Sequence, residues 1–293
     1  MGLKRSLFNA VNVIARQLTD RSQTCRQLAW ELYVEMTKSR ERWMPHRGMP
    51  LLVNIYDRGI GTRLYLGRGY GAGRITEMER VIRPGDRVID LGANIGYFTL
   101  LMARLVGPTG RVYAFEPDPR CAGLIKRSLE RNGFHNTVIE QKAVSNANAQ
   151  MTFHLHDSWT SNALAAIDGS VGEVTVPVVA LDDYLADADE IKFVKMDIDG
   201  SEPLVIEGMK KTIKRSKDLH ILTEYQPGNL KRYYGDPLDF LTTARDLGLE
   251  LEAILDTERG RLPGLDVEPL RRVPKNGNLD LLFVRMASRS TAF

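Results

Sequence analysis

The chain has 293 residues, of which 43% are hydrophobic and 26% charged, and its net charge is +3. These values are ordinary for globular proteins, so the composition argues against a disordered chain and against a membrane-spanning protein. Residues 1–84 carry 15 Lys and Arg against 7 Asp and Glu, whereas the rest of the chain carries 25 against 30. Solvated helical faces commonly produce such an asymmetry, and no basic cluster is interleaved with aromatic residues, so we expect no nucleic-acid partner.

The first 50 residues predict an amphipathic helical extension. Apolar residues recur at helical spacing over residues 7–18 and again over residues 25–36. We expect this extension to act in assembly or docking, by packing on the main domain or by forming a homo-oligomer, and we favour peripheral membrane contact less. Polar residues interrupt the apolar start and no small-residue cleavage site follows, which predicts a cytoplasmic location.

The main domain is expected over residues 51–293, with a lead-in over residues 51–84. Apolar and polar positions alternate after residue 50, and a glycine-rich stretch follows from Gly67 to Gly73. This pattern predicts a strand pair and a loop. The loop is either a connector or a lid over a cofactor.

Residues 88–98, VIDLGANIGYF, predict a strand, a tight turn and the start of a helix. Gly92 and Gly96 let the backbone approach a ligand, and the helix that begins there offers unpaired N–H groups. Asp90 would repel a pyrophosphate but would pair with the ammonium of a methionine moiety. Because the third glycine of a dinucleotide fingerprint is missing as well, we expect S-adenosylmethionine rather than NAD.

A second strand over residues 111–115 ends at Glu116 and Pro117. Doubly wound folds place an acid at this position, where a carboxylate accepts hydrogen bonds from ribose hydroxyls. The next strand is expected over residues 137–144, and its end, which includes Ala143, falls where an adenine edge would be held. These residues therefore belong to the predicted cofactor site.

The middle of the chain predicts two strands around a polar loop near residues 154–172. Apolar residues alternate over residues 151–155 and 174–178, and the loop between them is rich in His, Ser, Asp and Asn. Such a loop suits a polyhydroxylated substrate, and a solvated insertion is the alternative. His156 lies in this loop as a candidate base.

Two further strands deliver carboxylates to the same edge of the predicted sheet. Asp197 follows the strand over residues 191–196, and Glu224 follows the strand over residues 220–223. Ligands of open α/β sheets bind at this edge. Further helices are predicted over residues 121–132, 204–213 and 238–247, and final strands over residues 249–255 and 279–286.

Several segments between Glu77 and Gln226 resemble the FkbM family of S-adenosylmethionine-dependent methyltransferases. They are VIDLGANIGYFTLLMA, VYAFEPDP, LDDYL, FVKMDIDGSEPLVIEGM and ILTEYQP, in this order. The resemblance implies a class I methyltransferase domain: an α/β, Rossmann-like, seven-stranded sheet, mostly parallel with an antiparallel final strand. It also implies that Asp197 lies beside the transferred methyl group. The predicted cofactor-binding residues are Asp90, Gly92, Ala93, Asn94, Gly96, Glu116, Pro117, Ala143 and Asp197.

The function expected from these features is O-methylation of a hydroxyl on a sugar, a glycosylated metabolite or a polyketide-like small molecule. An NAD(P)-dependent Rossmann oxidoreductase is an alternative, which the missing glycine and the absence of a YxxxK pair disfavour. A non-catalytic cofactor-binding subunit is another, which the carboxylates at the sheet edge disfavour. A nucleic-acid methyltransferase would need an NPPY-type or PC-containing motif, and the sequence has none.

The predicted chemistry is in-line attack of a substrate oxygen on the methyl group, with a base that accepts the hydroxyl proton. Asp197 is the first candidate for the reacting centre, and Glu224 and His156 are the alternatives for the base. Asp197, Glu224 and Gln226 offer three oxygen ligands that could hold Mg²⁺. We do not favour this alternative, and we predict no metal site.

Overall fold

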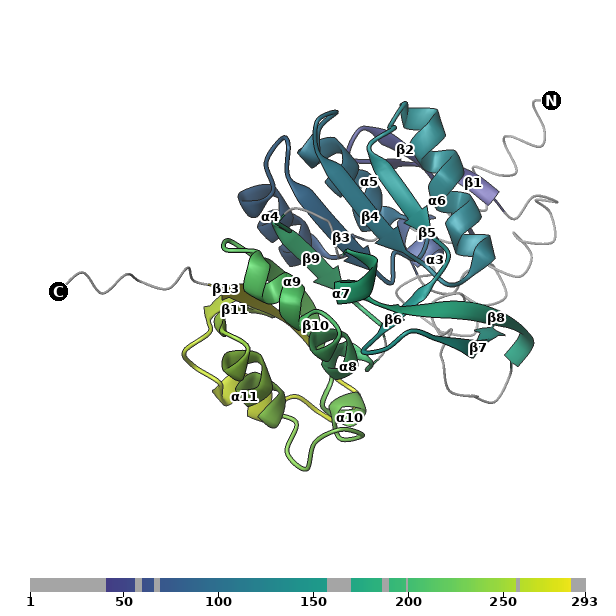
Figure 1. Cartoon of the computed structure of the whole chain (residues 1–293). Helices are drawn as coiled ribbons and strands as arrows, with labels where there is room; N and C mark the ends of the chain where they lie inside the picture. Colours follow the sequence, from purple (N-terminus) through teal and green to yellow (C-terminus); the bar gives the residue numbers. More distant parts are fainter. Residues whose placement is uncertain are drawn as a thin grey trace, which may run out of the picture.

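The computed structural model describes residues 41–55, 60–65, 69–156, 170–185, 190–198, 200–256 and 259–285. Within these ranges a sheet of eight strands forms the centre of the protein (Figure 1). Its strands in chain order are β3 (Arg87–Leu91), β4 (Arg111–Phe115), β5 (Thr137–Glu140), β9 (Phe193–Met196), β10 (His220–Tyr225), β11 (Leu249–Asp256), β12 (Gly260–Pro263) and β13 (Leu279–Arg285).

The spatial order of these strands is β12-β11-β13-β10-β9-β3-β4-β5. The run from β10 to β5 is parallel throughout, whereas β13 lies antiparallel to both β10 and β11. The predicted class I methyltransferase arrangement, a mostly parallel sheet with an antiparallel final strand, is therefore confirmed. In addition, β12 pairs with β11 at the edge of the sheet.

Helices cover both faces of the central sheet (Figure 1). One face carries α4 (Ala72–Val81), α5 (Tyr97–Val106) and α6 (Pro119–Asn132). The other face carries α7 (Leu181–Tyr184), α8 (Glu202–Glu207), α9 (Lys210–Arg215) and α11 (Asp239–Asp246). The short helices α3 (Ile60–Tyr65), α10 (Pro227–Leu230) and α12 (Glu268–Arg271) lie in connections.

Successive residues of the central strands pack into different layers, because side chains alternate across a strand. In β3, Val88 packs with α4, α5 and α6, whereas Ile89 packs with the helices of the other face. Phe193 and Val194 of β9 divide in the same way. Strands covered on both faces are apolar at nearly every position, which is why the sequence pattern predicts them well.

The lead-in before the central sheet differs from the prediction. A hairpin of β1 (Glu41–His46) and β2 (Met49–Asn54) packs against α6, where the Leu52 amide donates to Ser128 Oγ at 3.0 Å. Residues 41–50 are therefore strands rather than part of the predicted helical extension. Of the strand pair predicted after residue 50, the first strand is confirmed as β2, whereas the second is wrong, because α3 and α4 follow β2. The two amphipathic helices predicted before residue 40 lie outside the described residues.

A small sheet of order β6-β8-β7 follows β5. It consists of β6 (Ala143–Ser145), β7 (Ala149–His156) and β8 (Ser170–Ala180). The strand predicted over residues 137–144 is confirmed as β5 up to Glu140, but its continuation to residue 144 is wrong, because the chain leaves the central sheet there and β6 pairs with β8. The two strands predicted around the polar loop are confirmed, whereas most of the loop lies outside the described residues.

The helix predicted over residues 204–213 is divided into α8 and α9 at Gly208. A Cβ at Gly208 would lie 2.2 Å from the carbonyl oxygen of Ser145, so the end of β6 packs directly on this backbone. Across the described part of the chain, no helix combines the length and apolar character that a membrane span requires.

Candidate active site

The turn between β3 and α5 is held against the ends of two neighbouring strands. The amides of Gly92 and Ala93 both donate to the carbonyl oxygen of Phe115, each at 3.1 Å, at the end of β4. On the other side, a Cβ at Gly92 would lie only 2.0 Å from the carbonyl oxygen of Asp197, which follows β9. The backbone of Gly92 has φ +70°, and Asn94 also has positive φ, at 50°. The turn thus depends on glycine for both its conformation and its close packing.

Replacement of Gly92 by alanine should destabilise the fold by about 2–5 kcal/mol, because it adds overpacking to left-handed backbone strain. Gly133 provides a matched control, since its φ is +69° but a Cβ there would have no atom within 4 Å. Gly133→Ala should cost only about 1–2 kcal/mol, which is the cost of the conformation alone. Urea denaturation of both variants checks this difference. Equal losses of stability in the two variants would show that the Asp197 carbonyl oxygen does not prevent a side chain at position 92.

Asp90 is fully buried directly before this turn. Its Oδ2 accepts a hydrogen bond from Thr99 Oγ1 at 2.6 Å, whereas its Oδ1 has no hydrogen-bond donor among the described residues. Lys195 Nζ lies 3.3 Å from that Oδ1, donates to the carbonyl oxygen of Gly92 at 2.9 Å, and lies 3.8 Å from Asp197 Oδ2. Lys195 therefore connects the predicted cofactor acid to the predicted catalytic acid.

Burial disfavours the charged form of Lys195, but the attraction of Asp90 and Asp197 outweighs burial and raises the pKa of Lys195. The ammonium thus stays charged in an interior position, where an unpaired charge would be costly.

Glu116 is buried at the end of β4, as predicted. Its Oε2 accepts from the Asn94 amide at 2.6 Å and its Oε1 from the Asp118 amide at 2.9 Å, so the carboxyl group joins the β3 turn to the β4 end. Burial raises the pKa of Glu116 to about 7, against the opposing effect of these two amides.

Beside Asp197, charged side chains from α4, β9, β10 and β13 converge on one guanidinium. Arg74 donates to Asp197 Oδ2 at 2.7 Å and to Asp280 Oδ2 at 2.7 Å, and another of its nitrogens lies 2.7 Å from Asp280 Oδ1. Glu224 Oε1 lies 3.7 Å from the same guanidinium. We call the group formed by Arg74, Lys195, Asp197, Glu224 and Asp280 the Arg74 cluster.

Aromatic rings border the Arg74 cluster. The guanidinium carbon of Arg74 lies 5.9 Å from the ring centres of both Tyr70 and Phe98, and Lys195 Nζ lies 5.4 Å from the Phe98 ring. These cation–π contacts and the low exposure of Arg74, 8% of the residue, restrict the guanidinium to one position.

The two predicted catalytic carboxylates have opposite pKa shifts. Burial favours the neutral form of Asp197, but Arg74 and Lys195 outweigh burial and lower its pKa. For Glu224, burial and repulsion from Asp197 raise the pKa to about 7, although Asn278 donates a hydrogen bond to it. Near neutral pH, Asp197 is therefore a fixed anion, while Glu224 can gain or lose a proton.

A family comparison agrees with this geometry. The model of the methyltransferase FkbM domain matches residues 90–251, which is more than half of the chain. The chain belongs to the FkbM methyltransferase family. The match begins at Asp90 and includes the β3 turn, Glu116, Lys195, Asp197 and Glu224, whereas Arg74 and Asp280 lie outside it.

The FkbM-family chain is also similar to shorter stretches of other methyltransferases. It is 45% identical over 56 residues to a protein-L-isoaspartate O-methyltransferase of Aeropyrum pernix, which covers 19% of this chain and 22% of that protein. It is 34% identical over 58 residues to a probable cobalt-precorrin-6B C(15)-methyltransferase (decarboxylating) of Saccharolobus solfataricus, covering 20% and 29%. The chain thus spans less than a third of the length of these curated relatives.

Among solved structures, an FkbM methyltransferase of Methylobacillus flagellatus has a TM-score of 0.44 and 16% identity, covering 72% of this chain and 50% of that one. A SAM-dependent O-methyltransferase of Thermotoga maritima has a TM-score of 0.44 and 14% identity, covering 78% and 71%.

The remaining predicted site residues of this FkbM-family protein lie at varied positions. Pro117 follows Glu116 and is half-buried. Ala143 lies in β6 with its side chain packed against Phe153, Val176 and Val178, so it faces the core of the small sheet. Its predicted role at an adenine edge stays a prediction.

His156 is the last residue of β7, where its backbone pairs with Ser170 of β8. The polar loop that follows it, residues 157–169, lies outside the described residues, and the role of His156 as a base also stays a prediction.

The geometry does not fit the alternative of a Mg²⁺ site. Arg74 donates to Asp197 Oδ2 and Asn278 donates to Glu224 Oε1, so each carboxylate already has one oxygen engaged in a hydrogen bond. Gln226 accepts a hydrogen bond from Asn229 instead of joining these carboxylates. Among the described residues, no group of three or more His, Cys, Asp or Glu side chains is arranged to hold a metal ion.

Three residues of the Arg74 cluster were not among the predicted site residues of this family member. Lys195 and Asp280 carry a sequence signal, because each is a charged residue between two apolar neighbours in its strand. The sequence signal at Arg74 is weaker, because Gly71 and Gly73 favour a loop, whereas in the structure α4 begins there.

Proposed function

We propose that this FkbM-family protein transfers the methyl group of S-adenosylmethionine to a hydroxyl oxygen of a small acceptor, such as a sugar, a glycosylated metabolite or a polyketide-like molecule. The observation that carries the proposal is the position of Lys195 between Asp90 and Asp197, 3.3 Å and 3.8 Å from their carboxylates. It places a candidate cofactor acid and a candidate catalytic acid at adjacent strand ends. Ligands of open α/β sheets bind at this edge.

The residues at the β3 turn fit the cofactor. Asp90 Oδ1 forms an ion pair with Lys195 Nζ at 3.3 Å but accepts no hydrogen bond from the described residues, so it could accept one from the ammonium of the methionine moiety. Glu116 at the end of β4 would accept hydrogen bonds from the ribose hydroxyls. In addition, carboxyl groups outnumber Arg74 and Lys195 around the site, which favours a ligand with a cationic sulfonium.

The cofactor supplies a methyl group that is already activated, so the protein has to align the acceptor and remove a proton. Asp197, held ionised by Arg74 and Lys195, would accept a hydrogen bond from the acceptor hydroxyl and orient it. Glu224, whose pKa is raised to about 7, is the better general base, because a base works best when its pKa is near the working pH.

Calorimetry with S-adenosylmethionine and, separately, with NAD⁺ tests the cofactor. Release of S-adenosylhomocysteine in the presence of a panel of hydroxylated acceptors tests the reaction. Binding of NAD⁺ without binding of S-adenosylmethionine would overturn the proposal.

Glu224→Gln should lower kcat by about 100-fold or more, because the amide cannot accept the proton. In the unmodified protein, activity should rise with pH through about 7 as the raised pKa of Glu224 is passed, and this rise should disappear in the variant. The measurement is S-adenosylhomocysteine formation between pH 5.5 and 9. Glu252→Gln is the control, since Glu252 pairs with Arg80 and Arg261 away from the Arg74 cluster. A variant that retains full turnover and the same pH profile would transfer the role of base to His156.

A further inference from the structure

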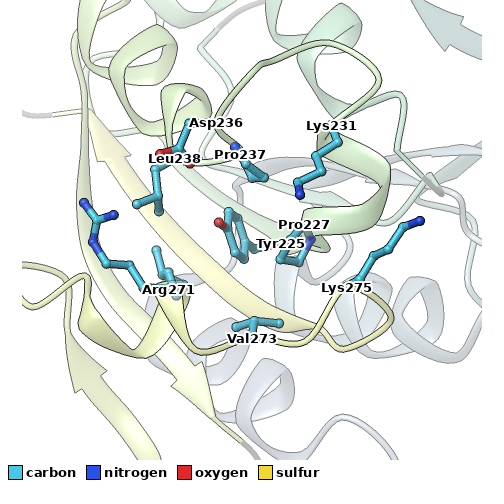
Figure 2. Close-up of a pocket in the computed structure, with 10 residues that line it drawn as sticks. Tyr225, Pro227, Lys231, Asp236, Pro237, Leu238, Arg271, Val273 and Lys275 are labelled. Carbon is cyan, nitrogen blue, oxygen red and sulfur yellow. Dashed lines mark hydrogen bonds between the residues drawn. The ribbon is translucent and has the colours of Figure 1, made fainter.

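A pocket of about 250 Å³ lies beyond the carboxyl end of β10, outside the residues considered so far (Figure 2). Tyr225, the last residue of β10, lies at its centre, and the walls come from α10, the segment before α11, α12 and the loop after α12. The buried side chains of Leu270 and Pro227 contribute apolar surface.

The walls of this pocket are held in place by backbone contacts. The Gly228 amide donates to the carbonyl oxygen of Lys275 at 3.1 Å, and a Cβ at Gly228 would lie 2.5 Å from that oxygen. Asp236 Oδ1 accepts from the Leu238 amide at 2.9 Å, which fixes the turn before α11. The pocket is therefore formed before any ligand enters, which lowers the cost of binding.

Positive charge dominates the described lining of the pocket. Lys231, Arg271 and Lys275 contribute three cations, whereas Asp236 is the acid. Figure 2 shows Lys231 and Arg271 on opposite sides of the Tyr225 ring. Arg271 pairs with Glu268 at 3.8 Å, but both side chains are more than half exposed, so a ligand can replace this contact at little cost.

The Tyr225 hydroxyl adds a neutral donor. Burial and the nearby Asp236 raise the pKa of Tyr225 to about 12, so the hydroxyl keeps its proton. Within the described ranges this hydroxyl has no hydrogen-bond partner. A donor between two cations, above an apolar floor, suits an anionic oxygen group.

Strand β10 separates this pocket from the Arg74 cluster. Thr223 of β10 is in register with Met196 of β9, so the next residue, Glu224, lies beside Asp197. Side chains alternate along a strand, and consecutive residues are about 3.3 Å apart along it. Glu224 thus faces the Arg74 cluster while Tyr225 faces the pocket. The pocket therefore lies on the opposite face of the central sheet from the Arg74 cluster, so it is a site separate from that cluster.

We infer that the pocket binds the anionic group, a phosphate or a carboxylate, of a sugar-sized ligand. This inference goes beyond the proposed function, because the pocket shares no residue with the Arg74 cluster. Anion binding can therefore be measured without a cofactor.

Titration calorimetry of the full chain with glucose 6-phosphate, glucuronate, glucose and inorganic phosphate tests the inference. We expect glucose 6-phosphate or glucuronate to bind at least about tenfold more tightly than glucose, and the stronger of the two identifies the preferred anion. Lys231→Ala and Arg271→Ala should each weaken that binding by about fivefold or more. Both side chains are exposed, so the variants should fold.

Lys217→Ala is the matched control, because Lys217 is an exposed lysine before the opposite end of β10. It should leave anion binding unchanged. Equal affinities for glucose and the two acidic sugars, or equal losses in Lys217→Ala and Lys231→Ala, would overturn the inference. Inorganic phosphate that binds while neither acidic sugar does would also overturn it. S-adenosylmethionine binding, measured on the same samples, reports separately on the proposed function.

Discussion

Replacement of Arg74 by methionine should lower the free energy of unfolding by about 3–5 kcal/mol and abolish methyl transfer. The guanidinium is the shared partner of Asp197 and Asp280, at 2.7 Å from each, and both carboxylates lie largely out of solvent. Methionine fills a similar volume but leaves two buried carboxylates without their main partner. Removing one partner of a buried ion pair is strongly destabilising, because the remaining charge is left uncompensated. Urea denaturation measures the change in stability.

Arg80→Met on the same helix is the control for this prediction. The Arg80 side chain is 43% exposed, and its partner Glu77 keeps a second contact with Arg261 at 2.8 Å. We expect a loss below about 1 kcal/mol there. The double variant Arg74→Met with Asp280→Asn should be more stable than the sum of the single losses predicts, because one unpaired charge is removed. Similar losses in Arg74→Met and Arg80→Met would contradict a central role for Arg74.

Asp90→Asn should weaken S-adenosylmethionine binding by about 10- to 100-fold, since a charge-assisted hydrogen bond contributes about 1.5–3 kcal/mol. The amide keeps the shape of the side chain and can still accept from Thr99 Oγ1, so the turn should persist. Loss of the carboxylate also removes one partner of Lys195, whose pKa should then fall. Calorimetry with S-adenosylmethionine measures the affinity.

Thr99→Val is the matched control for Asp90→Asn, because it removes the hydrogen bond to Oδ2 and leaves the charge in place. S-adenosylmethionine affinity in this variant should change by less than about threefold. If Asp90→Asn bound the cofactor as tightly as the unmodified protein, Asp90 would be a structural partner of Lys195 and not a cofactor ligand.

The central sheet was predictable because its strands are buried on both faces. A strand such as β3 is apolar along most of its length and ends at a polar turn, so its position and its carboxyl end can both be read from the residues. The carboxylates Asp90, Glu116, Asp197 and Glu224 follow from the same pattern, since each lies at or near such an end.

The parts that were not predictable depend on tertiary contacts. The start of α4 contains Gly71 and Gly73, which favour a loop, yet the helix forms because Ile75 and Met78 pack into the core. No change in amino-acid composition marks the break between β5 and β6, because both strands contain apolar residues that pack into the layer each strand belongs to. The ion pair of Arg74 and Asp280 joins residues 206 positions apart, a distance over which sequence patterns carry no information about contact.

The separation of 206 positions between Arg74 and Asp280 also determines when the Arg74 cluster can first form during protein synthesis. β13, which carries Asp280, is the final strand of the sheet in the chain, yet it lies between β10 and β11. At 5–20 residues per second, a ribosome would add Asp280 roughly 10–40 s after Arg74. In the last part of that interval, after β11 has been added and before β13, both β10 and β11 lack their common neighbour, and their exposed edges could pair with other chains. Chaperones that bind nascent chains should therefore matter most for this protein just before its last strand emerges.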